Sequence, residues 1–378
     1  MKKAVLVFII FIVQYPAVAS QASGNTQYWS YDEYISLHPE QAQLTQNFSS
    51  QVRSKTQTSA LRNGISIAFV YPGKQASDYW RRSVSSFEAR LFESDIDYQI
   101  YNYFSKPGVE INKQIEHIAS ALEHQPDYLI FTLDAIKHQV VIERLIAKKK
   151  PKIILQNITT PLKIWGDTQP FLYVGFDHAL GTKILIKEYL QRFPEGAQYA
   201  IFYGPKGYVS EMRGGTFRQA FIKNNAFELA DEYFTGFDRT KAKQAALQVF
   251  KDHPNIDFIY SCSTDIALGV LDAIKQSKKT NVITNGWGGG STELAAIEEG
   301  SLDMTVMRIN DDNGVAMADA ILNDLSNKPT PAIYSGNIVL VNKAMKKGDI
   351  ESLRLNAFRY SDNWNTTPEH ATKNTNKK

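Results

Sequence analysis

Amide, hydroxyl, indole and guanidinium side chains recur in this sequence directly after short apolar runs. Such a set suits a small polyhydroxylated ligand, because indoles offer flat apolar walls and amides and carboxylates bracket hydroxyl groups. Two arginines beside one obvious carboxylate favour an anionic ligand, since an unpaired guanidinium is costly to desolvate. The candidate ligand-binding residues are Gln75, Ser77, Trp80, Thr132, Asn157, Tyr208, Arg213, Thr264, Asp265, Trp287 and Arg308.

Each of these residues also has an ordinary structural interpretation. Ser77 and Thr264 are suitable helix caps, and the spacing of Trp80 also fits the buried face of a helix. Arg213 and Arg308 could each pair with a surface acid. Their shared position after strands favours the ligand-binding interpretation.

Catalytic chemistry lacks its usual sequence signatures. The seven histidines are scattered without metal-ligand spacing, and no G-x-S-x-G motif occurs. The adjacent Asp311 and Asp312 cannot flank a glycosidic bond. The glycine-rich segment 286–291 has the spacing of neither the G-x-G-x-x-G motif nor the P-loop motif of nucleotide-binding proteins. The lone Cys262 lies in a buried-strand pattern and is expected to be an inert core thiol. We therefore expect no enzyme activity, no catalytic residue, no metal and no cofactor.

Alternating strand and helix patterns must position the candidate residues. Apolar runs predict strands covered on both faces, and helix-period segments lie between them, as in βαβ units. Ligands of such parallel sheets bind beyond the carboxyl ends of the strands. The runs span residues 65–71, 128–133, 152–155, 173–176, 199–203, 257–261 and 281–284.

The chain has the length of two domains preceded by an export signal. Lys2 and Lys3 precede the apolar run 4–13, and residues 17–19 form an A-x-A pattern, which is typical of a bacterial signal peptide and predicts a periplasmic location. The net charge of +3 is too small to support nucleic-acid binding by composition alone. We assign 1–19 to the signal peptide, 26–62 to an N-terminal helical arm, 63–172 plus 309–332 to an N-terminal lobe, 173–308 plus 333–361 to a C-terminal lobe, and 362–378 to a polar tail.

This layout resembles the ribose-type periplasmic binding proteins, and in particular their subgroup that binds the quorum-sensing signal autoinducer 2 in vibrios. The resemblance implies an α/β fold of two lobes, each a doubly wound parallel sheet, joined by a hinge, with the N-terminal helical arm in addition. Its densest blocks are residues 71–80, 128–134, 154–161, 170–178, 261–265, 285–291 and 305–312.

The resemblance also implies a ligand and a partner. The ligand is the furanosyl borate diester form of autoinducer 2, an anion whose charge Arg213 and Arg308 balance. The other candidate residues contact it or line its pocket. The implied partner is the periplasmic domain of a LuxQ-like membrane hybrid sensor kinase, whose output changes when the ligand closes the two lobes. No membrane insertion and no nucleic acid are expected.

Three other classes share part of this pattern. A sugar-binding protein of an ABC transporter has the same fold, but a neutral sugar does not require both Arg213 and Arg308. A secreted enzyme acting on sugars would need a carboxylate pair across the cleft, where only Asp265 is clearly placed. A LacI-type repressor would need an N-terminal helix-turn-helix in place of the export signal.

Overall fold

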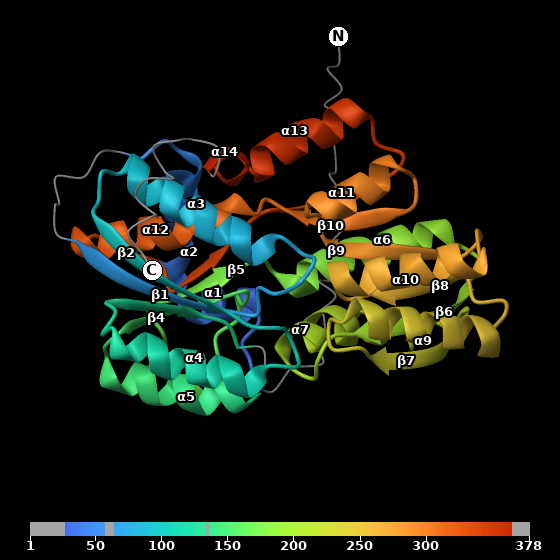
Figure 1. Cartoon of the computed structure of the whole chain (residues 1–378), viewed down its shortest axis with the longest axis horizontal. Helices are drawn as coiled ribbons and strands as arrows, with labels where there is room; N and C mark the ends of the chain where they lie inside the picture. Colours follow the sequence, from blue (N-terminus) through green and yellow to red (C-terminus); the bar gives the residue numbers. More distant parts are fainter. Residues whose placement is uncertain (1–26, 57–63, 134–135, 365–378) are drawn as a thin grey trace, which may run out of the picture.

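Two β-sheets frame the molecule, one in each of two lobes that lie side by side (Figure 1). The computed structural model describes residues 27–56, 64–133 and 136–364. The signal peptide assigned to 1–19 therefore lies outside the described residues. The arrangement confirms the predicted fold class of two lobes built on parallel sheets.

The first lobe contains a six-stranded, fully parallel sheet in the order β11-β5-β4-β3-β1-β2. Successive side chains of a strand point to opposite faces. Ile67 and Phe69 accordingly pack with α2, α3 and α12, while Ala68 and Val70 pack with α4 and α5. The elements are β1 (Ile65–Tyr71), α3 (Tyr79–Glu93), β2 (Tyr98–Phe104), α4 (Ile111–Glu123), β3 (Tyr128–Phe131), α5 (Ile136–Lys148), β4 (Lys152–Gln156), η1 (Lys163–Trp165), β5 (Leu172–Gly175), α12 (Asp311–Leu325), β11 (Ile333–Ser335) and α14 (Ser361–Trp364).

The second lobe repeats this plan in the order β12-β10-β9-β8-β6-β7, with only β12 antiparallel to its neighbour. Its helices α9 and α10 pack together, as do α6 and α8. The elements are α6 (His178–Arg192), β6 (Ala197–Tyr203), α7 (Tyr208–Ser210), η2 (Glu211–Gly215), α8 (Thr216–Phe221), β7 (Phe227–Phe234), α9 (Arg239–Asp252), β8 (Phe258–Ser261), α10 (Thr264–Ser277), β9 (Ile283–Gly288), α11 (Ser291–Glu298), β10 (Met304–Arg308), β12 (Ile338–Asn342) and α13 (Lys347–Ala357).

The chain crosses between the lobes four times, after β5, after β10, after β11 and after α13. Two of the predicted lobe boundaries are therefore wrong. Residues 173–175 and 333–335 were assigned to the C-terminal lobe, yet β5 and β11 pair with each other at the edge of the first sheet. The chain leaves the first lobe after β5 and after β11, because each of these strands forms its hydrogen bonds within the first sheet.

The N-terminal arm consists of two helices packed on the first lobe. Helix α1 (Tyr31–Leu37) begins with a capping box, in which Ser30 and Glu33 each accept a hydrogen bond from the backbone N–H of the other. Helix α2 (Pro39–Arg53) buries Phe48 and Val52 against the core that includes α3 and α12. Residue 26 and residues 57–62, the two ends of the predicted arm, lie outside the described residues.

The predicted polar tail starts too early. Residues 361–364 form α14, and its Trp364 is buried beside α3. Asp362 forms ion pairs with Arg82 and Arg354. Residues 362–364 are therefore part of a short helix packed on the first lobe, although their composition is polar. Residues 365–378 lie outside the described residues.

Candidate ligand-binding site

A small cavity, of about 40 Å³, is lined by residues that follow the carboxyl ends of strands in both lobes. Eight of the eleven predicted residues line it, and their contact with a ligand stays a prediction. The eight are Gln75, Ser77, Trp80, Asn157, Arg213, Thr264, Trp287 and Arg308.

Three predicted residues lie elsewhere. Thr132 is buried at the end of β3 and is absent from the cavity lining. The hydroxyl of Tyr208 accepts a hydrogen bond of 2.8 Å from Thr160, and its ring packs on Tyr28 of the arm. Neither residue lines the cavity, because a position after a strand does not fix which way its side chain points.

Asp265, the third, joins the two lobes beside the cavity. Its carboxylate, at the start of α10, accepts hydrogen bonds from the backbone N–H groups of Ala76 (2.9 Å) and Ser77 (3.3 Å) in the first lobe. Burial raises the pKa of this carboxyl, while the two hydrogen bonds oppose that shift. Asp265 therefore holds the loop between β1 and α3 against the second lobe.

Six lining residues were missed by the sequence analysis. Pro107 and Phe237 follow the edge strands β2 and β7, which were also missed, so the same search after strand ends would have found them. These two loops meet across the lobes, where a Cβ atom on Gly108 would lie 2.8 Å from the carbonyl oxygen of Gly236. The missed residues are Pro72, Tyr79, Pro107, Val209, Phe237 and Ser263.

Arg213 lies in the π-helical turn η2 and is held on three sides. Its guanidinium stacks 3.6 Å from the centre of the Trp287 ring, and its Nη1 donates to the carbonyl of Cys262 at 2.8 Å. Its Nε donates to Nδ1 of His178 at 3.2 Å. Burial, and next the charge of Arg308, lower the pKa of Arg213 to about 9. Its environment thus disfavours the positive charge when no anion is present.

The guanidinium of Arg308, the last residue of β10, has no hydrogen bond or ion pair with any described residue. Its guanidinium lies 3.9 Å from the centre of the Tyr79 ring, and its buried Nε lacks a hydrogen-bond partner. Burial lowers its pKa, although the charges of Glu293 and Asp78 act in the opposite direction. The side chain is only 5% exposed, so the described part of the chain leaves a second cation without direct compensation.

The glycine-rich segment at the end of β9 presents Trp287 to the cavity. Gly288 and Gly289 have φ values of 140° and 66°, and a Cβ atom on either would clash, with Arg308 or with Met307. The buried carboxylate of Glu293 accepts hydrogen bonds from the backbone N–H groups of Trp287 (3.0 Å) and Gly289 (2.7 Å). These contacts give the segment a structural role, in line with its lack of a nucleotide-binding spacing.

Asn157 and Trp80 supply an amide and an indole from the first lobe. Asn157 has a φ of 67°, a left-handed conformation that asparagine tolerates, and its buried Oδ1 has no hydrogen-bond partner. Trp80 lines the cavity and also packs on Tyr71 at 4.6 Å between ring centres. The core and ligand interpretations of Trp80 are therefore both compatible with its position.

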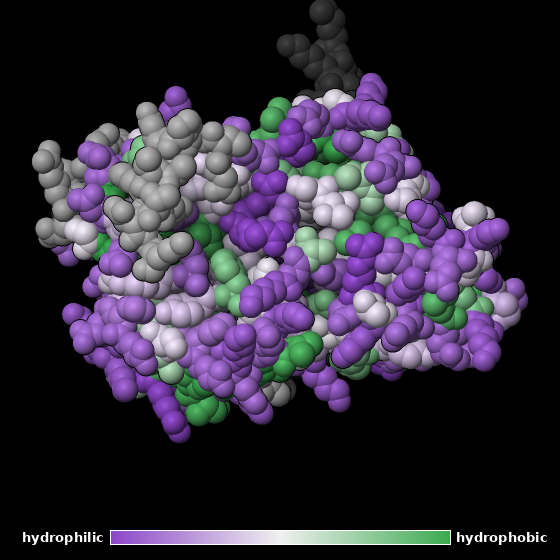
Figure 2. All heavy atoms as spheres, in the orientation of Figure 1, coloured by the Kyte–Doolittle hydropathy of each residue, from purple (hydrophilic) through white to green (hydrophobic). Residues whose placement is uncertain are grey.

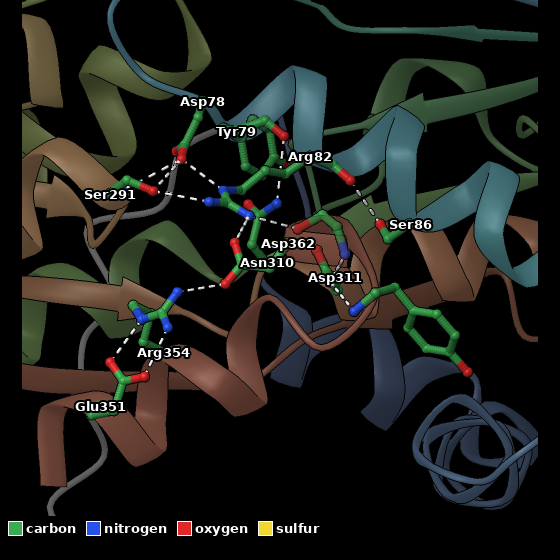
Figure 3. Close-up of polar contacts among 12 residues, drawn as sticks. Asp78, Tyr79, Arg82, Ser86, Ser291, Asn310, Asp311, Glu351, Arg354 and Asp362 are labelled. Carbon is green, nitrogen blue, oxygen red and sulfur yellow. Dashed lines mark hydrogen bonds and ion pairs between the residues drawn. The ribbon is translucent and has the colours of Figure 1, made fainter. Parts of the chain in front are cut away.

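A polar network joins the lobes outside the cavity (Figure 3). Asp78 accepts hydrogen bonds from Arg82 (2.6 Å) and from the hydroxyl of Ser291 (2.8 Å) in the second lobe. Asp362 lies between Arg82 of the first lobe and Arg354 of α13 in the second. On this face, hydrophilic side chains gather where the two lobes meet (Figure 2). Polar contacts thus join the two lobes around the cavity.

A model of the periplasmic binding protein domain matches residues 67–329, which is more than half of the chain. The chain belongs to this family. Among described residues, no helix of this periplasmic binding protein is long and apolar enough to cross a bilayer, and no group of three or more His, Cys, Asp or Glu side chains could hold a metal ion.

Two curated relatives bind sugars, according to their names. The ribose import binding protein RbsB of Salmonella typhimurium is 27% identical over 154 residues, which cover 40% of this chain and 52% of that protein. The D-allose-binding periplasmic protein of Escherichia coli K12 is 28% identical over 161 residues, covering 42% and 49%. The chain spans about half the length of the curated relatives it matches.

Solved structures share the fold of this periplasmic binding protein at low identity. A periplasmic solute-binding protein of an ABC transporter from Actinobacillus succinogenes, with bound D-allose, has a TM-score of 0.65 at 18% identity, covering 74% of this chain and 98% of that one. The fructose-binding periplasmic domain of a hybrid two-component system has a TM-score of 0.66 at 18% identity, covering 83% and 99%.

Proposed function

We propose that this protein is a periplasmic receptor for autoinducer 2, which it binds as the furanosyl borate diester between its two lobes. On this proposal it is LuxP-like and acts on the periplasmic domain of a LuxQ-like membrane hybrid sensor kinase. The sequence resemblance supports this assignment, as does the likeness to a sugar-binding domain of a hybrid two-component system.

The pair of buried arginines carries the proposal. Neither Arg213 nor Arg308 forms an ion pair with a described residue, and burial lowers the pKa of both. A bound anion would supply the missing compensation, and charged hydrogen bonds to it contribute about 1.5–3 kcal/mol each. A neutral sugar would leave both charges uncompensated.

Closure of the lobes is how such a ligand would act on a partner. A ligand shifts a conformational equilibrium only by its difference in affinity for the two states. Ser77 and Asn157 of the first lobe face the same cavity as Thr264 and Arg308 of the second, so a ligand would contact both sets only in the closed form. The kinase would then recognise the relative position of the lobes.

Calorimetric titration of the purified protein with the autoinducer 2 precursor, first in boron-depleted buffer and then with borate, tests the proposal. Tight binding only with borate supports it, and Arg213→Ala and Arg308→Ala should each weaken that binding by about 10- to 100-fold. The matched control is Arg239→Ala, which removes a half-exposed arginine paired with Asp272 on the surface. Equal binding without borate would refute the boronated ligand.

A second candidate is the sugar-binding component of an ABC transporter. It is favoured by the names of the curated relatives, which bind ribose and D-allose. Titration with a panel of pentoses and hexoses separates the two candidates. Tight binding of one neutral sugar, with no response to the precursor and borate, would replace the proposed function by sugar transport.

A further inference from the structure

His178 is a buried histidine that contacts both lobes at the cavity but was not among the predicted site residues. It is the first residue of α6, directly after the chain first crosses from the first lobe to the second, and its side chain is 1% exposed. Its Nε2 lies 2.9 Å from the carbonyl oxygen of Asn157, and its Nδ1 lies 3.2 Å from Nε of Arg213. The imidazole thus bridges two residues that line the cavity from opposite lobes.

The chemistry of these two partners determines the tautomer of the ring. An arginine Nε always carries a hydrogen, so it can only donate, and Nδ1 of His178 must accept. A backbone carbonyl can only accept, so Nε2 must carry the hydrogen and donate to Asn157. The contacts therefore require a neutral ring protonated at Nε2.

The surroundings of the ring exclude its charged form. The aromatic rings of Tyr208 and Trp287 lie 5.6 and 5.2 Å from the imidazole, between ring centres. The charged groups that act on it are Arg213 and Arg308, both cationic. Burial first, and then these charges, lower the pKa of His178 well below its ordinary range. A proton on Nδ1 would also face the N–H of Arg213.

The histidine leaves one edge of the Arg213 guanidinium available. Nε donates to His178 and Nη1 donates to the carbonyl of Cys262, whereas Nη2 has no hydrogen-bond partner among the described residues. The guanidinium plane is also fixed by stacking on Trp287, so the group can turn only if its contacts with His178 and Cys262 break.

We propose that His178 is a positioning residue, which orients the Arg213 guanidinium for an anionic ligand and couples that orientation to Asn157 in the other lobe. This inference rests on the proposed function for the ligand's charge, but its geometric part does not need the ligand. A side chain that accepts at the Nδ1 position should preserve the effect on Arg213. One that can only donate at the Nε2 position should not.

Two amide substitutions separate the two contacts. In His178→Asn, the Oδ1 atom can take the place of Nδ1 as the acceptor for Arg213, while the contact with Asn157 is lost. In His178→Gln, the amide reaches the Nε2 position and can donate to Asn157, while the acceptor for Arg213 is lost. We expect His178→Asn to retain affinity for the precursor with borate within about threefold, and His178→Gln to lose about 10- to 100-fold, the effect of one hydrogen bond to a charged group.

Equal thermal stability of the two variants is the condition for comparing them, and the same titration without borate is the control. Equal affinity of wild type and His178→Gln would overturn the proposal. If the wild type itself does not bind the precursor, the proposed function fails instead, and the geometric part is decided separately. To test the geometric part, ¹⁵N NMR of histidine-labelled, ligand-free protein should show a neutral His178 ring protonated at Nε2 from pH 5.5 to 8. A ring protonated at Nδ1, or a titration of His178 in this range, would overturn the geometric part.

Discussion

Arg308→Met should make the ligand-free protein more stable while removing its affinity for an anion. The guanidinium of Arg308 is buried without an ion pair or a hydrogen bond to any described residue. An uncompensated buried charge costs about 3–5 kcal/mol. The contact with the Tyr79 ring at 3.9 Å offsets about 2 kcal/mol of that cost. Replacing the guanidinium by an apolar side chain should therefore raise the free energy of unfolding by at most about 1–3 kcal/mol, because the nearby charges of Glu293 and Asp78 offset a further part of that cost.

Arg90→Met is the matched control, because Arg90 is equally buried but paired. Its guanidinium forms two hydrogen bonds with the carboxylate of Asp319, at 2.8 and 3.0 Å, and both side chains are 1% exposed. Removing this arginine leaves a buried carboxylate without its partner, which should lower the free energy of unfolding by about 3–5 kcal/mol. The two substitutions make the same chemical change and should move stability in opposite directions.

Urea and thermal unfolding of ligand-free protein measure both effects. For domains of this size, a change of 1 kcal/mol shifts the melting temperature by about 2–4 °C, so Arg308→Met should melt several degrees above the wild type. Titration with the precursor and borate then gives the loss of affinity. If Arg308→Met melts below the wild type, Arg308 is compensated in the ligand-free protein and the argument for an anionic ligand from its burial is wrong.

Two further predictions concern carboxylates outside the cavity. Asp362→Asn should weaken ligand affinity about two- to fivefold at low salt, because the closed form loses the ion pairs with Arg82 and Arg354. If the affinity of the variant still differs from that of the wild type in 1 M salt, the ion pairs are not the cause. Burial raises the pKa of Asp311 to about 6. Between about pH 4 and pH 6 the native state therefore keeps a proton that the unfolded chain releases, so this carboxyl lowers the free energy of unfolding as the pH rises through that range. Asp311→Asn should remove that part of the slope in urea unfolding between pH 4 and 7, whereas a slope equal to that of the wild type would refute the assignment.

The central strands and the arginine pair could be predicted from the sequence, since both depend on burial patterns along the chain. The run 65–71 is apolar because helices cover both faces of β1. The edge strands β2 and β7 were not predicted, because their side chains are mostly half-buried and their sequences mix polar with aromatic residues. Pro107 and Phe237 were missed with them.

Contacts between residues distant in the chain were beyond prediction by pattern. The sequence places Asp265 after a strand and so near the cavity, but only the fold brings Ala76 and Ser77 to its carboxylate. His178 gives no signal by itself, because one histidine at the start of a helix is equally typical of a cap or a core residue. Its role depends on Arg213, 35 positions later, and on the crossing that precedes it.

The repeated crossing of the chain between the lobes has a consequence for the order in which the molecule can form. Helix α12 covers one face of the first sheet and β11 completes its edge, yet both follow the strands β6 to β10 of the second lobe in the sequence. The first lobe therefore cannot seal its core until about residue 335 has emerged from the ribosome or a translocation channel. The β6–β10 segment is continuous and needs only its edge strand β12 to complete its sheet. The first lobe therefore stays without its covering helix α12 and its edge strand β11 until most of the sequence has been synthesised.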